Sequence, residues 1–97
     1  MAQIRSNKSS GGAINYDYYT LVSSTPYAFT LASANISKLI IGLTDGAIEY
    51  TVVGDTVTAS SYKGTDQRTK LTVTKSGTTL TLTQTIAGSC YTTISYI

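Results

Sequence analysis

Apolar and polar side chains alternate with a period of two along most of the chain, as they do in half-buried β-strands. The first such segment covers residues 15–22 and the second covers 27–32, and Pro26 favours an extended loop between them. The two faces of the first segment carry Tyr16, Tyr18, Thr20 and Val22, and Asp17, Tyr19 and Leu21. The second segment brings together Tyr27, Phe29 and Leu31. Both segments are therefore predicted strands.

The centre of the chain predicts a three-stranded meander with two tight turns. Asp45-Gly46 is typical of a type I′ hairpin turn, because Asp and Gly tolerate the positive φ that this turn requires. Gly54-Asp55 indicates the second turn. Counting outward from these turns gives the pairs Leu43–Ile48, Ile41–Tyr50, Leu39–Val52, Val52–Val57 and Tyr50–Ala59. All these residues fall on one face, which is therefore the predicted buried face of the meander.

The C-terminal third predicts a loop, a third hairpin and a last strand. The loop is the polar segment Tyr62 to Lys70, and the hairpin turns at Ser76-Gly77. The predicted core pairs of this hairpin are Val73–Leu80 and Leu71–Leu82, and its other face carries Thr72, Thr74, Thr79, Thr81 and Thr83. After a turn at 87–89, the last strand covers 90–97 and alternates Cys90, Thr92, Ile94 and Tyr96 with the remaining side chains.

These elements predict an all-β fold, a single small antiparallel β-sandwich or barrel of about seven or eight short strands. This domain covers 14–97. Residues 1–13 are polar, contain Gly and Ser and lack a period, which predicts a flexible N-terminal arm. The 97 residues include 18 Thr and 12 Ser, so the predicted core is thin. A thin core and unpaired strand edges favour self-association or a place in a larger protein assembly.

The formal net charge of +2 belongs entirely to the N-terminal arm. Arg5 and Lys8 have no acidic neighbour there, whereas five basic and five acidic residues balance from Ile14 onward. Ile4, Arg5 and Lys8 are therefore the candidate docking residues of the arm. So small a charge predicts no nucleic-acid partner. No apolar run approaches the roughly 20 residues of a membrane span, and no signal peptide is expected, so we predict no membrane partner.

The inventory of reactive side chains argues against catalysis. The chain has no His, which excludes Ser–His and Cys–His nucleophiles. The acidic residues are scattered, and turn formation explains Asp45 and Asp55. Zinc would need a Cys or His cluster, whereas Cys90 stands alone, and no Asp-x-Asp pattern suits calcium. We therefore predict no enzyme activity, no metal and no cofactor, and interpret Cys90 as a small core or interface residue.

Tyrosines are the candidate binding residues. Tyr16, Tyr18 and Tyr19 lie close together on both faces of one strand, so alternation cannot bury all three. An exposed Tyr can stack on a sugar ring or anchor a protein interface. Together with polar side chains of the 62–70 loop, they define a candidate binding surface of Tyr16, Tyr18, Tyr19, Tyr62, Lys63 and Arg68.

The C-terminal segment LTVTKSGTTLTLTQTIAGSCYTTISYI, with its short Thr-rich hairpin and its Tyr- and Ile-containing last strand, resembles small β-structured virion proteins of tailed bacteriophages. These include capsid decoration proteins, head fibres and tail-fibre tips, and a polar arm before a compact β domain is similar to them too. The resemblance implies a non-catalytic virion subunit, assembled in the host cytoplasm and held to a capsid or tail by its arm and β surfaces. It carries over no particular functional residues.

A carbohydrate-binding β module is the alternative interpretation. In that case surface Tyr side chains stack on sugar rings, and the 62–70 loop supplies polar contacts to the glycan. The chain has no Trp, which would offer a larger stacking face.

Overall fold

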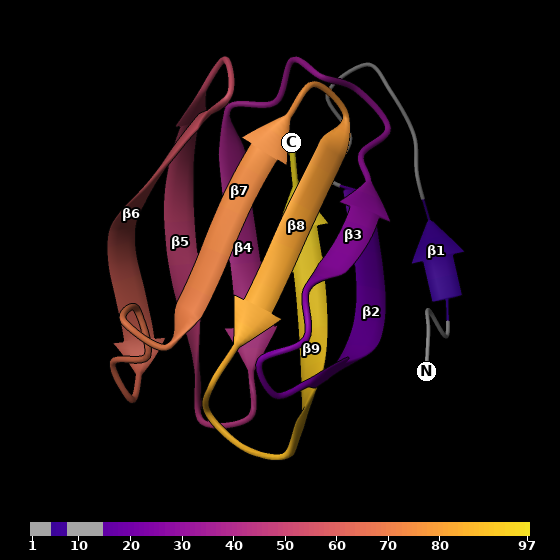
Figure 1. The fold of residues 1–97 in the computed structure, drawn as a ribbon. Coiled ribbons are helices and arrows are strands. Elements are labelled where there is room, and N and C mark those ends of the chain that lie inside the picture. Colours follow the sequence, from indigo (N-terminus) through magenta and orange to yellow (C-terminus); the bar gives the residue numbers. More distant parts are fainter. Residues whose placement is uncertain (1–4, 8–14) are drawn as a thin grey trace.

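The computed structural model describes residues 5–7 and 15–97, which form two antiparallel β-sheets packed face to face (Figure 1). The larger sheet has the order β1-β2-β9-β4-β5-β6 and the smaller one β3-β8-β7. The strands are β1 (Arg5–Asn7), β2 (Asn15–Val22), β3 (Tyr27–Thr30), β4 (Lys38–Leu43), β5 (Gly46–Val53), β6 (Thr56–Gly64), β7 (Leu71–Ser76), β8 (Thr79–Gln84) and β9 (Ser89–Tyr96). The prediction of an all-β antiparallel sandwich or barrel is confirmed, and the two packed sheets form a sandwich. In the described part of the chain, no helix is long and apolar enough to cross a membrane.

The core lies between the sheets and is built from the alternate residues that each strand turns inward. Tyr19 of β2 contacts Phe29 of β3 edge-on at 5.2 Å between ring centroids, and Phe29 contacts Tyr96 of β9 in the same way at 6.0 Å. These rings join the two sheets. The buried apolar side chains around them include Leu21, Leu39, Ile41, Ile48, Val52, Leu71, Leu80, Leu82 and Ile94.

The register of the β4–β5 hairpin differs from the predicted one by two residues. Leu43 pairs with Gly46 and Ile41 with Ile48, and neither Asp45 nor Gly46 has a positive φ, so the predicted type I′ turn at these residues was wrong. Gly46 is instead the first residue of β5. A Cβ atom there would collide with the backbone of β6 and of the residue that follows it. Because a shift of two keeps every side chain on its face, the predicted buried face is still correct.

The β7–β8 hairpin is also displaced by two residues. Val73 pairs with Leu82 and Leu71 with Gln84, because the turn lies at Gly77-Thr78 and Gly77 takes the positive φ of 59°. Gln84 lies on the same face of β8 as Leu80 and Leu82 and is buried opposite Leu71. There its side-chain amide donates to the carbonyl oxygens of Leu21 and Ala87 at 3.0 and 2.9 Å, and its own oxygen accepts two backbone N–H groups. Complete hydrogen bonding makes this buried amide tolerable.

The β5–β6 turn forms as predicted, whereas β6 is longer than predicted. Val52 pairs with Val57 and Tyr50 with Ala59, and Gly54 takes a φ of 61° in the turn. A register shift opposite Glu49 and Tyr50 leaves Ser60 as a β-bulge, after which β6 continues to Gly64. The expected loop at 62–70 is therefore confined to 65–70, and Tyr62 and Lys63 belong to the strand.

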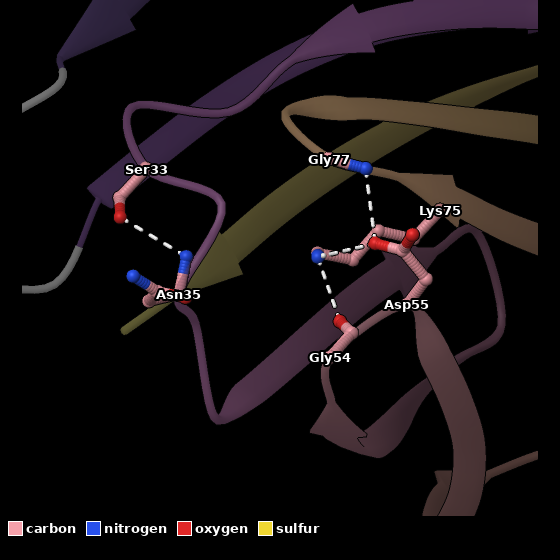
Figure 2. A network of polar contacts seen from close by, with 6 residues as sticks. All are labelled: Ser33, Asn35, Gly54, Asp55, Lys75 and Gly77. Atoms are coloured by element: carbon pink, nitrogen blue, oxygen red, sulfur yellow. Dashed lines mark hydrogen bonds and ion pairs between the residues drawn. The ribbon is translucent and has the colours of Figure 1, made fainter.

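A polar clamp joins the two sheets at one end of the sandwich (Figure 2). The Lys75 side chain is only 1% exposed, and its Nζ donates to the Gly54 carbonyl at 2.7 Å and to Asp55 Oδ1 at 3.1 Å. Asp55 Oδ1 also accepts the Gly77 N–H at 2.9 Å. This hydrogen bond and the ammonium group of Lys75 hold the pKa of Asp55 below its usual range. The β5–β6 turn of one sheet is thereby tied to the β7–β8 turn of the other.

The predicted N-terminal arm falls mostly outside the described residues. Ile4 and Lys8 lie outside them, and Arg5–Asn7 form the short strand β1, which pairs antiparallel with β2. Arg5 is the register partner of Tyr18 in this pair. In the described part of the chain, β1 and β6 are thus the two edges of the larger sheet.

Candidate functional site

The larger sheet turns one face toward the smaller sheet and the other face away from it (Figure 1). We refer to the second as the outer face. Alternation places Ile40 there, between the buried Leu39 and Ile41, and it places Tyr91 there beside the buried Cys90. Ile40 is 38% exposed and Tyr91 is 50% exposed, so the outer face presents apolar surface to solvent.

Cross-strand register arranges the outer face in rows that run across the strands. One row consists, from β2 to β6, of Tyr18, Thr93, Gly42, Ala47 and Lys63. The next row consists of Ser95, Ile40, Glu49 and Ser61. Small side chains thus occupy the middle of the first row, and larger ones stand at its two ends.

Tyr18 and Tyr91 form an aromatic pair at the β2–β9 end of these rows. Tyr18 is opposite Thr93, two residues from Tyr91, so the two tyrosines are diagonal neighbours on one face. Their rings lie nearly parallel, at an interplanar angle of 29° and a centroid distance of 5.8 Å. The pair therefore presents a stacked aromatic surface, which we call the tyrosine pair.

A shallow trough of about 310 Å³ lies at the β5–β6 end of the same rows. It is lined by Ile40, Ala47, Glu49, Ser61, Tyr62 and Lys63. A second depression of about 220 Å³ meets it at Ile40 and is also lined by Lys38 and Ser95. Between the two, Lys38 Nζ lies 3.4 Å from Glu49 Oε2. The trough thus combines an apolar floor with carboxylate, ammonium and hydroxyl groups.

An exposed cluster flanks the trough beyond the end of β6. The Arg68 guanidinium lies 4.5 Å from the centre of the Tyr62 ring and makes two 2.8 Å hydrogen bonds to the Asp66 carboxylate. The bonds to Arg68 hold the pKa of Asp66 below its usual range, and the same pairing raises the pKa of Arg68. The positive charge of Arg68 is therefore balanced by Asp66, and one face of its guanidinium group lies over the Tyr62 ring.

The structure separates the predicted binding residues into two groups. Tyr18 lies at the β2 end of the outer face and Lys63 at its β6 end. Tyr62 is also in β6, but it is opposite the buried Ile48 and so lies on the other side of the sheet, where Arg68 contacts its ring. The prediction that Tyr19 belongs to the binding surface is wrong. Tyr19 is 2% exposed, because its side chain points into the sandwich toward Phe29. The side chain of Tyr16 lies outside the described part of the structure, as do those of the arm candidates Ile4, Arg5 and Lys8.

Ile40, Glu49 and Tyr91 of the outer face were not among the predicted binding residues. Alternation in the sequence already indicates that Ile40 and Tyr91 face away from the core, so that signal was present. The sequence did not indicate that they lie on one surface, because this depends on β9, the last strand of the chain, lying between β2 and β4. The ion pair of Glu49 with Lys38 depends on the β4–β5 register, which alternation does not fix.

The chemistry available on this face is stacking, apolar contact and hydrogen bonding. Among the described residues, no group of three or more Asp, Glu, Cys or His side chains is placed to hold a metal ion. The buried Cys90 lies with its Sγ 3.3 Å from Thr44 Oγ1, and the buried Lys75 is committed to the clamp. The outer face is accordingly a candidate binding surface.

In comparisons with known proteins, no family model, curated sequence or solved structure matches this chain.

Proposed function

We propose that this protein is a non-catalytic structural subunit that assembles with further copies of itself, or with a larger protein particle, through its β surfaces. The resemblance of its sequence to virion proteins supports the finer form of the proposal, a bacteriophage subunit of the capsid-decoration or fibre type. In that form, the N-terminal arm docks on the particle and the β domain stands outside it.

The edge strand β6 is the observation that carries this proposal. β6 is the last strand of the larger sheet, and in the described structure it pairs only with β5. Every residue from 58 to 66 is exposed. A free edge of nine residues offers unpaired backbone N–H and C=O groups to another strand. Lys63 is the only charged residue in β6, so little charge opposes such pairing.

A charge placed on this edge tests the proposal. Ala59 is an exposed residue of β6 that faces the inner side opposite Tyr50, and a charge pointing inward on an edge strand blocks strand addition. We expect light scattering to show concentration-dependent association of the full chain and a monomer for Ala59→Lys. The control is Thr51→Lys, which adds the same charge on β5, flanked on both sides by strands.

A full chain that stays monomeric at high concentration would contradict the proposal, as would equal effects of the two lysine variants. Two further observations address the virion form. Adjacent capsid or tail genes support it, and a genomic neighbourhood without them argues against it. Removal of residues 1–13 should abolish docking on the particle while the circular dichroism of the β domain is retained.

A further inference from the structure

We propose that the outer face binds an uncharged oligosaccharide, laid across strands β9, β4 and β5 between the tyrosine pair and the trough. The inference concerns this face and not the β6 edge, so it goes beyond the proposed assembly function. It rests on the way the sheet brings exposed rings, an apolar floor and hydroxyl-binding groups into neighbouring rows.

The length of the site suits a ligand of several units. Tyr18 of β2 and Lys63 of β6 stand in the same row, and the four inter-strand spacings between them amount to about 19 Å. Gly42 and Ala47 form the middle of this row, and neither has a large side chain that would protrude from the sheet. An extended ligand can therefore lie across the strands and contact both ends.

The side chains along this path match the two surfaces of a sugar ring. Sugar rings have apolar C–H faces that stack on aromatic rings, and Tyr91, 50% exposed beside Tyr18, presents such a ring at one end of the path. Their hydroxyl edges need both donors and acceptors. Glu49 supplies an acceptor, Lys63 supplies a donor, and hydroxyl groups supply both. Those hydroxyl groups belong to Thr93, Ser95 and Ser61.

Other ligand classes fit this face less well. A peptide cannot add a strand here, because an unpaired backbone edge lies at the side of a sheet and not on its face. A polyanion would need a concentrated positive charge. The ammonium of Lys38 is instead paired with Glu49, and the guanidinium of Arg68 is paired with Asp66. Among the described side chains of this face, the remaining cation is Lys63, and a single charge gives little electrostatic selectivity.

The test is binding of the full chain to an array of neutral oligosaccharides and to insoluble cellulose and chitin, followed by titration calorimetry with the best soluble ligand. Tyr91→Ser removes an exposed ring, and Ala47→Phe fills the trough while both tyrosines remain. We expect each variant to weaken binding by roughly tenfold or more, the scale of one aromatic contact. Val53→Ser is the matched control, because Val53 is an exposed apolar residue at the far end of β5.

Measurements on the unaltered chain keep the test independent of variant folding. The ligand should shift the amide NMR signals of β9, β4 and β5 and leave those of β7 and β8 in place. Absence of neutral-glycan binding overturns the inference, as does equal binding by all three variants. Preferential, salt-sensitive binding of heparin overturns it in favour of a polyanion.

The two proposals fail separately. Ala59→Lys should bind the oligosaccharide like the unaltered chain although it no longer associates, and Tyr91→Ser should still associate. A chain that associates but retains no glycan contradicts only the inference about the outer face, and a monomer that binds glycan contradicts only the assembly proposal.

Discussion

At the scale of single residues, the core contains buried polar groups of two kinds. The Gln84 amide uses both its oxygen and its nitrogen in hydrogen bonds, and the Tyr96 hydroxyl accepts the Ala32 N–H at 2.8 Å. Tyr50 is different: its ring is buried, and its hydroxyl has no hydrogen-bonding partner among the described residues. A satisfied buried group fixes the packing around it, whereas an unsatisfied one costs about 1–3 kcal/mol of folding free energy.

Replacing this hydroxyl should therefore not destabilise the protein. We expect Tyr50→Phe to raise the free energy of unfolding at pH 7 by about 1 kcal/mol, because the ring packing is kept and the unsatisfied group is removed. Urea denaturation measures the change, with Tyr62→Phe as the control at an exposed ring. A loss of stability in Tyr50→Phe would show that the hydroxyl is bonded in solution.

The same residue predicts a dependence of stability on alkaline pH. Burial raises the pKa of Tyr50 from 10.0 to about 12, because the charged phenolate is poorly solvated in the core. The unfolded chain releases this proton first, so stability falls as the pH rises from about 10 to about 12. Tyr50→Phe lacks this proton, and the stability difference between the variant and the parent should widen over that range. A difference independent of pH would contradict the raised pKa.

At the scale of elements, close backbone approach decides where β5 begins. A Cβ at Gly46 would collide with the carbonyl oxygens of Lys63 and Thr65, and Asp45 O accepts the Thr65 N–H at 3.0 Å. Gly88 is the contrasting case, since a Cβ there would meet nothing within 4 Å and its φ is not positive. The two glycines therefore have different structural requirements.

This contrast predicts opposite effects of the same substitution. Gly46→Ala should lower the free energy of unfolding by about 1–3 kcal/mol. The added methyl group collides with backbone atoms, which cannot rotate away as a flexible side chain can. Gly88→Ala should leave it unchanged or raise it by up to about 1 kcal/mol, because the unfolded chain loses conformational freedom. Thermal denaturation of the pair checks both. Equal stability of the two variants would mean that the end of β6 yields to accommodate the methyl group.

At the scale of the whole molecule, the sandwich is held by its shared core and by the clamp at one end (Figure 2). Lys75 belongs to the smaller sheet, and its buried ammonium depends on Asp55 and Gly54 of the larger one. Removing one partner of a buried charge is costly, because the remaining charge is left without compensation. The clamp thus couples the two sheets through electrostatics as well as through packing.

Asp55→Asn tests this coupling. We expect a lower melting temperature at pH 7, because Lys75 loses its counter-charge. The folded pKa of Asp55 lies below its ordinary value of 3.8, so its contribution is present above that pH and is lost as the pH falls through the folded pKa. The difference between Asp55→Asn and the parent should accordingly shrink in acid. Asp45→Asn, at an exposed turn residue without an ion pair among the described residues, is the control and should melt like the parent.

How far the sequence predicts this fold differs between strands and turns. Alternation located β2 at 15–22, and it placed Ile41, Ile48 and Tyr50 on the buried face. It could not fix the two hairpin registers, because a shift of two residues leaves every face unchanged. Lys75 shares its face with Leu71 and Val73 in the alternation, yet its burial became evident only when Asp55 was placed beside it.

The candidate site was less predictable than the fold. Exposed tyrosines could be expected from the sequence, but the burial of Tyr19 depends on which face of β2 the smaller sheet covers. The rows of the outer face depend on strand order, which joins β2, β9 and β4 across most of the chain. Local patterns carry no information on pairing between such distant strands.

The sequence by itself determined the all-β class, the strands and the sides that most of them bury, because a period of two is a local property of a half-buried strand. Only the tertiary structure decided the registers, the strand order, the clamp around Lys75 and the meeting of Tyr18 with Tyr91. These features arise when backbone approach, hydrogen-bond satisfaction and charge pairing are met simultaneously by residues far apart in the chain, and no local pattern specifies that combination.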